Sequence, residues 1–295
     1  MNRFTIKDIE NLSGIKAHTL RIWEQRYGLL RPSRTDTNIR YYDNEDLKKI
    51  LRVAFLNKHG YKISRIDKMS DADMLAAARS IHHQTETNEW AVQELIEAMA
   101  DLDLLRFESV IDQSIAHRGL LRTANELFWT FFDKVGFLWM TGSINPAQEH
   151  LTSNIIRQKL LAGIDALPQP LPHLPAFLLY LPEGELHEMG LLYICYLLRS
   201  QGIPVIYLGA NIPAADVDFV FNYYHPAHIY IHLTSVLDDF DTAQFLTRIS
   251  GTFAGAGIYL SGKMLQAVTD PLPAGIQILR SFEEVAQVVD TLYEH

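Results

Sequence analysis

A histidine with the chemistry of a metal ligand lies directly after an apolar run in the second half of the chain. The run, 177–181, is followed by Glu185, His187 and Gly190, and an apolar helical pattern then covers 191–200. An imidazole at the mouth of a strand can ligate a metal axially, and a carboxylate two residues earlier can fix its tautomer. Strand-to-helix loops with these residues are common, so the pattern needs support from the rest of the chain.

Polar loops also follow later strands of the same region. Strands are predicted near 176–181, 203–208, 227–233, 256–260 and 276–279, and helices near 188–201, 213–224, 240–252, 263–268 and 282–293. This alternation predicts a parallel sheet with helices on both faces, whose ligands bind at the carboxyl ends of the strands. The loop of His187 follows the first strand, and polar loops with Ser235 and Ser261 follow the third and fourth.

Together the three loops resemble the cobalamin-binding signature, which reads Asp-x-His-x-x-Gly, then Ser-x-Leu, then Gly-Gly. The matching positions are Glu185, His187 and Gly190, then Ser235 and Leu237, then Ser261 and Gly262. The resemblance implies that His187 replaces the dimethylbenzimidazole base of the cofactor as the lower cobalt ligand. It also implies a slot between strands for the displaced base, where Ser235 bonds the ring nitrogen and Gly262 leaves room. Ser261 departs from the signature, which has glycine there.

The region before this sheet predicts a helical bundle. Amphipathic patterns cover roughly 71–83, 88–101, 103–117, 119–140 and 146–166, with the short connections that are typical of a four-helix bundle. Trp139 precedes a break in the pattern, and Glu149 and His150 lie early in the next helix. An indole can cover a flat macrocycle, and a carboxylate can accept hydrogen bonds from ribose hydroxyls. A core tryptophan beside a solvated Glu-His pair is the alternative.

This spacing resembles the helical module beside the cobalamin domain in B12-dependent photoreceptor regulators of the CarH and LitR type. The resemblance implies that Trp139 and Glu149, with His150 beside them, line the upper axial face that houses the adenosyl group. Some members carry a histidine directly after this tryptophan, and it ligates cobalt once light has cleaved the adenosyl group. Met140 stands there in this chain. A thioether is a poorer partner for Co(III) than imidazole, and His150 is the nearest substitute.

The two ends of the chain differ in charge. Residues 1–70 hold 15 Lys and Arg against 8 Asp and Glu, whereas residues 71–295 hold 11 against 27. A small basic head on an acidic body suggests that one end meets a polyanion. A merely solvated basic surface is the alternative.

The pattern within the basic head predicts a winged helix-turn-helix. Thr5 caps a helix over 6–12, a turn at Ser13-Gly14 follows, and a second helix covers 16–26. The second helix of such a pair enters the major groove of DNA. The arginine-rich stretch that follows is typical of a two-stranded wing.

This head resembles the winged helix-turn-helix domain of the MerR family over about 65 residues. The resembling residues are Thr5-Ile6, Thr19-Leu20-Arg21, Trp23-Glu24, Tyr27-Gly28-Leu29-Leu30, Pro32, Arg34, Arg40-Tyr41-Tyr42 and Asp46-Leu47. The resemblance implies that Thr19 and Arg21 lie on the recognition helix, where Lys16 is also directed outward. The DNA contacts that it implies from the wing are Arg34, Arg40 and Tyr41. Arginine suits bidentate phosphate contact, and a tyrosine hydroxyl adds a donor.

Length and composition predict two or three globular domains, with 295 residues, 48% hydrophobic and 21% charged. We expect the head over 1–70, a four-helix-bundle cap over 71–168 and an α/β cobalamin-binding domain over 175–295. Because 71–80 lacks a sustained heptad pattern, a coiled-coil dimer is not favoured. The single cysteine, Cys195, excludes an internal disulfide and fits a cytoplasmic location. Apolar runs of 18 or more residues are absent, so no membrane partner is expected.

These observations predict a multidomain α and α/β protein with a winged helix-turn-helix head, a helical bundle and a Rossmann-like (flavodoxin-like) parallel sheet. The leading hypothesis is a DNA-binding transcriptional regulator, a repressor and not an enzyme, controlled by cobalamin. Adenosylcobalamin as a light sensor is the expected cofactor. Expected partners are a double-stranded DNA operator and further copies of the chain, up to a cofactor-dependent tetramer. The alternatives are a degenerate B12-like domain that serves protein interaction without cofactor, and a corrinoid enzyme subunit.

Overall fold

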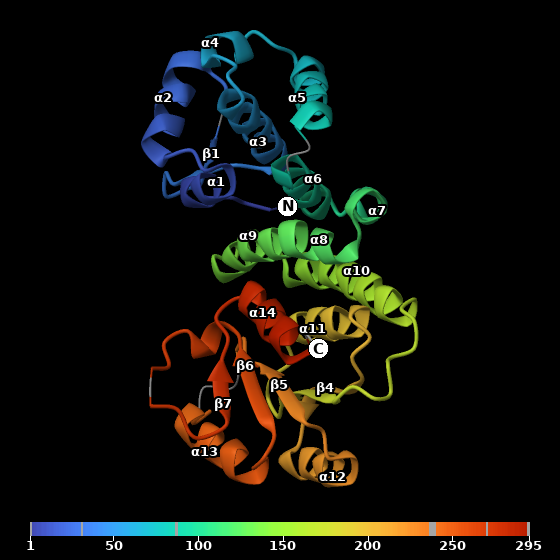
Figure 1. Ribbon diagram of the computed structural model, residues 1–295. Coiled ribbons are helices and arrows are strands. Elements are labelled where there is room, and N and C mark those ends of the chain that lie inside the picture. The colour runs from blue at the N-terminus through green and yellow to red at the C-terminus, as the bar shows by residue number, and fades with distance from the viewer. Residues whose placement is uncertain (1, 31, 86–87, 236–239, 270, 294–295) are drawn as a thin grey trace. The chain divides into compact units, whose positions relative to one another are not determined.

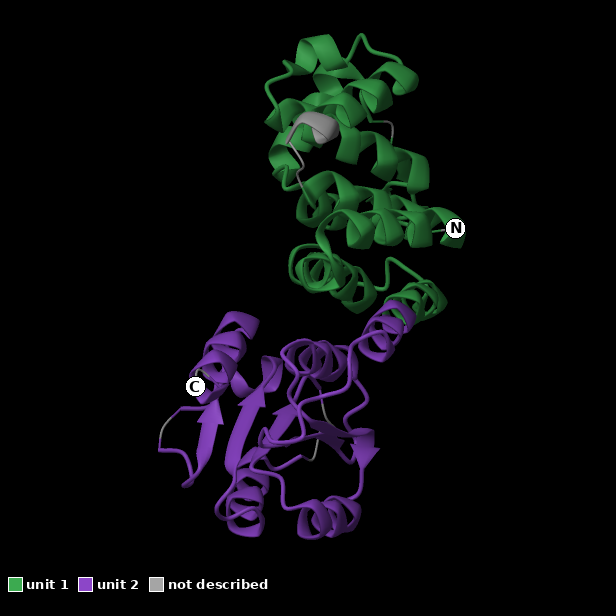
Figure 2. Cartoon of the chain, turned by 45° about the vertical axis from the view of Figure 1, so that its right-hand side comes forward, with its two compact units in different colours: residues 1–156 green, residues 157–295 purple. Residues whose placement is uncertain are grey.

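The computed structural model describes residues 2–30, 32–85, 88–235, 240–269 and 271–293 (Figure 1). The chain divides into two compact units, Met1–Ile156 and Arg157–His295 (Figure 2). The boundary falls within helix α10 (Pro146–Asp165). Among the described residues, no helix has both the length and the apolar composition needed to cross a bilayer.

The first unit begins with the predicted winged helix-turn-helix. Its elements are α1 (Ile6–Ser13), α2 (Ala17–Tyr27), β1 (Ser33–Arg34), β2 (Arg40–Tyr41), α3 (Asn44–Lys58) and α4 (Ile63–Ile66). Thr5 caps α1 as expected: its hydroxyl accepts from the backbone N–H of Asp8, whose carboxylate accepts from the N–H of Thr5. Gly14 ends the helix in the left-handed conformation. Leu20 and Trp23 of α2 are buried in the core.

The helical bundle continues the first unit. It contains α5 (Asp71–Thr85), α6 (Asn88–Asp101), α7 (Leu104–Arg118), α8 (Leu120–Thr123), α9 (Trp129–Met140) and the start of α10. The pattern predicted one helix over 119–140, but a π-helical turn, η1 (Ala124–Phe128), separates α8 from α9. The turn buries Leu127 and Phe128 completely. A π turn is a known device of functional regions, and periodicity alone does not reveal it.

Buried polar contacts join the head to the bundle inside this unit. The carboxylate of Asp8, fully buried on α1, accepts from Ser143 Oγ at 2.7 Å and lies 3.0 Å from Thr141 Oγ1. Lys134 Nζ on α9 donates to the carbonyl of Leu12 at 2.8 Å, and Arg52 on α3 pairs with the buried Glu97 at 2.9 Å. Separating buried polar groups from their partners costs free energy, so these contacts hold the head against the bundle.

The second unit is the predicted α/β domain. Among its described residues, five parallel strands form a sheet in the order β4-β3-β5-β6-β7. Their bounds are β3 (Phe177–Pro182), β4 (Val205–Ile212), β5 (His228–His232), β6 (Gly257–Ser261) and β7 (Ile276–Ile278). Strand order reverses next to β3, so the loops after β3 and β5 meet at the switch point where α/β sheets bind ligands.

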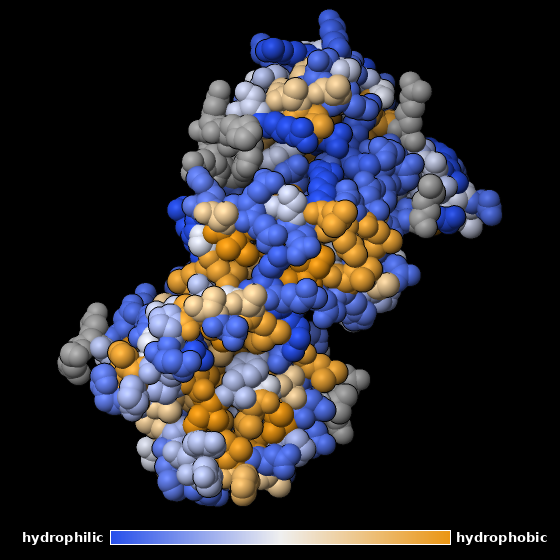
Figure 3. Space-filling model, turned by 90° about the vertical axis from the view of Figure 1, so that its right-hand side faces the viewer, coloured by the Kyte–Doolittle hydropathy of each residue, from blue (hydrophilic) through white to orange (hydrophobic). Residues whose placement is uncertain are grey.

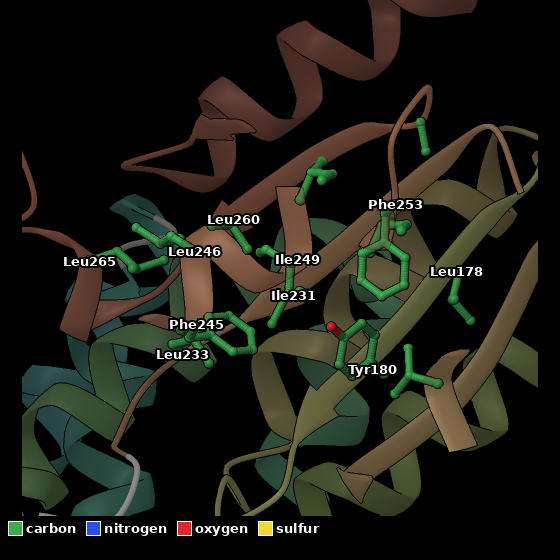
Figure 4. Close-up of a cluster of buried hydrophobic side chains, with 14 residues drawn as sticks. Leu178, Tyr180, Ile231, Leu233, Phe245, Leu246, Ile249, Phe253, Leu260 and Leu265 are labelled. Carbon is green, nitrogen blue, oxygen red and sulfur yellow. The ribbon is translucent and has the colours of Figure 1, made fainter. Parts of the chain in front are cut away.

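Helices cover both faces of this sheet. They are α11 (Met189–Ser200), α12 (Ala214–Tyr224), α13 (Thr242–Thr252) and α14 (Phe282–Tyr293). Figure 1 shows α11 and α14 on one face and α12 and α13 on the other. Figure 4 shows the apolar cluster between strands and helices, where Ile231 and Leu260 lie among Phe245, Ile249 and Phe253. The helix predicted over 263–268 is only a short 3-10 turn, Lys263–Leu265.

Candidate cofactor site and nucleic-acid interface

The carboxylate of Glu185 organises the loop after β3. It is fully buried, and its Oε1 accepts from His187 Nδ1 at 2.7 Å and from the His187 backbone N–H at 2.8 Å. Its Oε2 accepts from the backbone N–H groups of Thr234 and Ser235, at 2.7 and 2.8 Å, after β5. Burial alone would raise the pKa of Glu185, but these hydrogen bonds hold the pKa below its usual value. The carboxylate therefore stays ionised and ties two loops together.

The imidazole of His187 is oriented by this carboxylate. Because Nδ1 donates to Glu185, the ring adopts the tautomer whose Nε2 carries the lone pair. The side chain is 56% exposed, at the carboxyl edge of the sheet. The hydrogen bond that the sequence predicted between these two residues is thus present, and it is the arrangement that metal-ligating histidines use.

The end of β4 supplies further supports that the sequence reasoning missed. Asn211 accepts from the N–H of Gly184 at 2.9 Å and donates its own N–H to the Glu185 carbonyl at 3.1 Å. Glu188 accepts from the Tyr207 hydroxyl and from Arg157 Nε, both at 2.9 Å. Burial and the nearby Glu188 raise the pKa of Tyr207, so its hydroxyl remains a donor. These residues lie on separate elements of the chain, and no local spacing pairs them.

The other signature residues lie at the same edge. Ser235 meets Glu185 through its backbone N–H, while its side chain is exposed. Gly190 is buried at the start of α11, and a Cβ there would lie 2.5 Å from His232 Nε2. A Cβ on Gly262 would lie 2.2 Å from the Leu233 carbonyl oxygen. Gly262 is therefore required by the backbone beside it, and Gly190 leaves room for the His232 ring. The remaining signature residue, Leu237, lies outside the described residues.

The first unit carries the residues predicted for the upper face. Trp139 and Met140, the last two residues of α9, are 55% and 66% exposed. Glu149 Oε2 lies 2.8 Å from His150 Nδ1 on α10. The exposed indole excludes the alternative of a core tryptophan. Figure 3 shows that hydrophobic residues reach the surface of both units. In the second unit Leu186, next to His187, is an apolar residue whose exposed fraction is 69%.

The exposed face of α2 is suited to DNA. Arg21 and Arg26 are exposed, with Ile22 half exposed between them, whereas Thr19 is partly buried. Lys16 precedes the first residue of the helix, and its Nζ lies 3.0 Å from Glu10 Oε1. An arginine on the exposed face of such a helix can reach a base edge or a phosphate.

The wing residues differ in how tightly the head holds them. Arg34 is exposed and donates to Asn38 Oδ1 at 2.7 Å. Arg40 Nε instead lies 3.5 Å from the partly buried Glu24. The guanidinium of Arg3 stacks 5.0 Å above the ring of Tyr41. Of the three predicted contacts, Arg34 is the most exposed, whereas Arg40 also serves the packing of the head.

A basic winged head, a helical bundle and a parallel sheet with a carboxylate-oriented histidine define a DNA-binding regulator with a ligand domain. A family model described as MerR HTH family regulatory protein matches residues 4–73, and one described as B12 binding domain matches residues 91–162. The second match covers the helices of the bundle.

Curated relatives agree with these matches. The HTH-type transcriptional repressor CarH of Myxococcus xanthus is 30% identical over 221 residues, which are 72% of this chain and 73% of CarH. The repressor CarA of the same organism is 29% identical over 212 residues, which are 71% of this chain and 69% of CarA. The chain therefore belongs to the MerR-type regulators of the CarH and CarA family. It is a DNA-binding transcriptional regulator controlled by B12, and the enzyme and cofactor-free alternatives are not favoured.

The fold agrees with a solved corrinoid protein. The monomethylamine corrinoid protein of Methanosarcina barkeri superposes with a TM-score of 0.54 at 12% identity, covering 71% of this chain and 100% of that one. At this identity the likeness concerns the fold alone.

Proposed function

We propose that the chain represses transcription in the dark with adenosylcobalamin bound and releases DNA in light. The observation that carries the proposal is the hydrogen bond between Glu185 and His187 at the carboxyl edge of the sheet, where Oε1 lies 2.7 Å from Nδ1. The family to which the chain belongs supports cobalamin as the ligand, and so does the match of the B12 binding domain model to the helices of the bundle. Such a regulator would act on its operator in the cytoplasm.

The lower ligand is assigned to His187. A lone pair on Nε2 and an anionic partner on Nδ1 raise the basicity of the imidazole toward a metal. The backbone N–H groups of Thr234 and Ser235 on Glu185 keep that partner in place. The ligand is therefore oriented before the cofactor arrives, and binding costs little ordering of this loop.

The upper face is assigned to Trp139, Glu149 and His150. When bound, adenosylcobalamin would supply a light-labile cobalt–carbon bond. The exposed indole offers a flat apolar surface, and Glu149 offers an acceptor for ribose hydroxyls. Met140 stands beside the indole, and because its thioether is a weak ligand for cobalt, this residue would contribute packing and not a metal bond.

A short polar connection links this face to the DNA-binding head. Thr141 and Ser143 follow Trp139 almost directly, and both lie within hydrogen-bond distance of the Asp8 carboxylate. Asp8 in turn closes the capping box of α1, the helix before the recognition helix. We propose that a shift of the loop after Trp139 alters the position of α1, and with it the DNA affinity of the head.

DNA contact is assigned to Lys16, Thr19 and Arg21 of the recognition helix and to Arg34, Arg40 and Tyr41 of the wing. Replacing Arg21 with Ala should lower affinity for duplex DNA and reduce the salt dependence by about one phosphate contact. Several heads assembled as a dimer or tetramer would bind adjacent sites together, which raises avidity. An Arg21→Ala variant with unchanged affinity for duplex DNA would remove that residue from the interface.

A spectral titration tests the cofactor assignment. The apo protein is titrated in the dark with adenosylcobinamide, which has no tail base of its own, so binding through His187 is expected to change the corrin absorption. The His187→Ala variant should lose this spectral change, whereas His173→Ala, at an exposed histidine of the same unit, should keep it. Equal spectra for wild type and His187→Ala would contradict the assignment.

A further inference from the structure

The imidazole of His232 fills a space at the edge of the sheet. His232 ends β5, and its Nδ1 lies 2.7 Å from Ser261 Oγ at the end of β6. On its other side the ring is stacked on Phe282, the first residue of α14, with ring centroids 6.0 Å apart and planes inclined by 13°. The edge of the ring abuts Gly190, where a Cβ would come within 2.5 Å of Nε2. Three elements thus enclose one imidazole.

This space is bounded by the signature residues themselves. Gly190 belongs to the first part of the cobalamin signature and Ser261 to the third. The resemblance to the cobalamin signature implies that the base of the cofactor's nucleotide tail enters a slot beside these positions. His232 presents there a flat, neutral heteroaromatic ring with a hydrogen bond and a stacking partner, which is the chemistry of a benzimidazole base. Burial lowers the pKa of His232 to about 4, so the ring is uncharged near neutral pH.

Ser261 holds this ring in place. Its hydroxyl lies within hydrogen-bond distance of both His232 Nδ1 and the buried Tyr230 hydroxyl. A glycine at Ser261 would break this chain of hydrogen bonds and leave Nδ1 of His232 without that partner. The serine at position 261, where the signature has glycine, is therefore what holds the His232 ring in its place.

We infer that the His232 ring occupies the place of the tail base, so the base must displace this ring when cobalamin binds. His232 and Ser261 therefore set the preference between corrinoids with and without a nucleotide tail. This inference rests on the proposed binding of a corrinoid through His187. A corrinoid that lacks the tail leaves His232 in place and makes no displacement. A complete cobalamin must break the hydrogen bond to Ser261 and the stack on Phe282 before its own base takes them over.

The test compares two ligands on the full-length apo protein. Adenosylcobalamin and adenosylcobinamide, which has the same corrin without the nucleotide tail, are titrated in the dark and their dissociation constants compared. Replacing His232 with Ala should strengthen adenosylcobalamin binding about tenfold relative to adenosylcobinamide, since one hydrogen bond and one stack no longer oppose the tail. Ser261→Gly should shift the ratio in the same direction by less, and it carries the test if His232→Ala does not fold.

A matched control lies on the same strand. His228 begins β5 at the opposite end from His232, and it packs on Phe177 with ring centroids 4.7 Å apart. The His228→Ala variant should keep the wild-type ratio of the two affinities. An unchanged ratio in both His232→Ala and Ser261→Gly would overturn the inference while leaving corrinoid binding intact. Failure of the wild type to bind either corrinoid would instead overturn the proposed function, and the inference with it.

Discussion

The loop of His187 and the end of α9, which are assigned to the two faces of the cofactor, are built in opposite ways. The loop of His187 is fixed by a buried carboxylate that accepts four hydrogen bonds. The end of α9 instead leaves the side chains of Trp139 and Met140 more than half exposed. The difference separates two tasks. A ligand that must always be in place is pre-organised by buried polar contacts, whereas the side chains of a surface that must respond to a change are left largely exposed.

The largest effect is expected where the pre-organised loop loses its carboxylate. Replacing Glu185 with Ala leaves the N–H groups of Thr234 and Ser235 unpaired, and should lower the free energy of unfolding by about 3 kcal/mol. Cobalamin affinity should fall by about 10- to 100-fold because His187 is no longer oriented. Urea unfolding and dark titration measure both. The exposed neighbour Glu183 provides the control, since Glu183→Ala should change neither quantity.

Lowering the pH should gradually remove the contribution of Glu185 to the free energy of unfolding. The pKa of Glu185 is held below its usual value of 4.5, so its contribution to stability is fully present above about pH 4.5 and is lost as the pH falls below that. The thermal unfolding midpoints of wild type and Glu185→Gln should therefore differ most near neutral pH and converge in acid. A difference that does not change between pH 6 and pH 3 would argue against an ionised, hydrogen-bonded Glu185.

A smaller effect is expected at the link between the upper face and the head. Ser143→Ala removes one buried hydrogen bond to Asp8 and should cost about 1–2 kcal/mol of stability. If the link transmits the response, the difference in DNA affinity between dark and light should shrink in this variant while dark cobalamin binding is kept. Ser153, a partly buried serine of α10 whose hydroxyl donates to the His150 carbonyl, is the control. A full light response in Ser143→Ala would exclude this route.

The smallest effect on stability is expected at Trp139. Because the indole is 55% exposed, Trp139→Ala should change the free energy of unfolding by no more than about 0.5 kcal/mol. The same variant should lose part of the preference for adenosylcobalamin over hydroxocobalamin, because the surface that covers the adenosyl group is gone. A large loss of stability would mean that Trp139 is a packing residue, and the comparison between the loop of His187 and the end of α9 would fail.

Local patterns in the sequence predicted much of this molecule. The alternation of apolar strands and helices predicted each strand of the sheet to within a few residues, and Thr5 and Gly14 marked the ends of α1. The bond between Glu185 and His187 could be expected because the two residues are close in sequence.

Contacts between distant segments could not be predicted in the same way. The pairing of Glu188 with Tyr207 and Arg157, and that of Asp8 with Ser143, depends on how elements pack, which no single spacing encodes. The π turn η1 was not predicted for a different reason, since one extra residue in a turn hardly changes an amphipathic pattern.

The size of the protein in solution, with adenosylcobalamin in the dark and after illumination, tests the central claim most directly. The account predicts an oligomer in the dark that dissociates in light, and a His187→Ala variant whose size is the same in both conditions. A wild-type protein whose size and DNA affinity are unchanged by light, although adenosylcobalamin is bound, would contradict it.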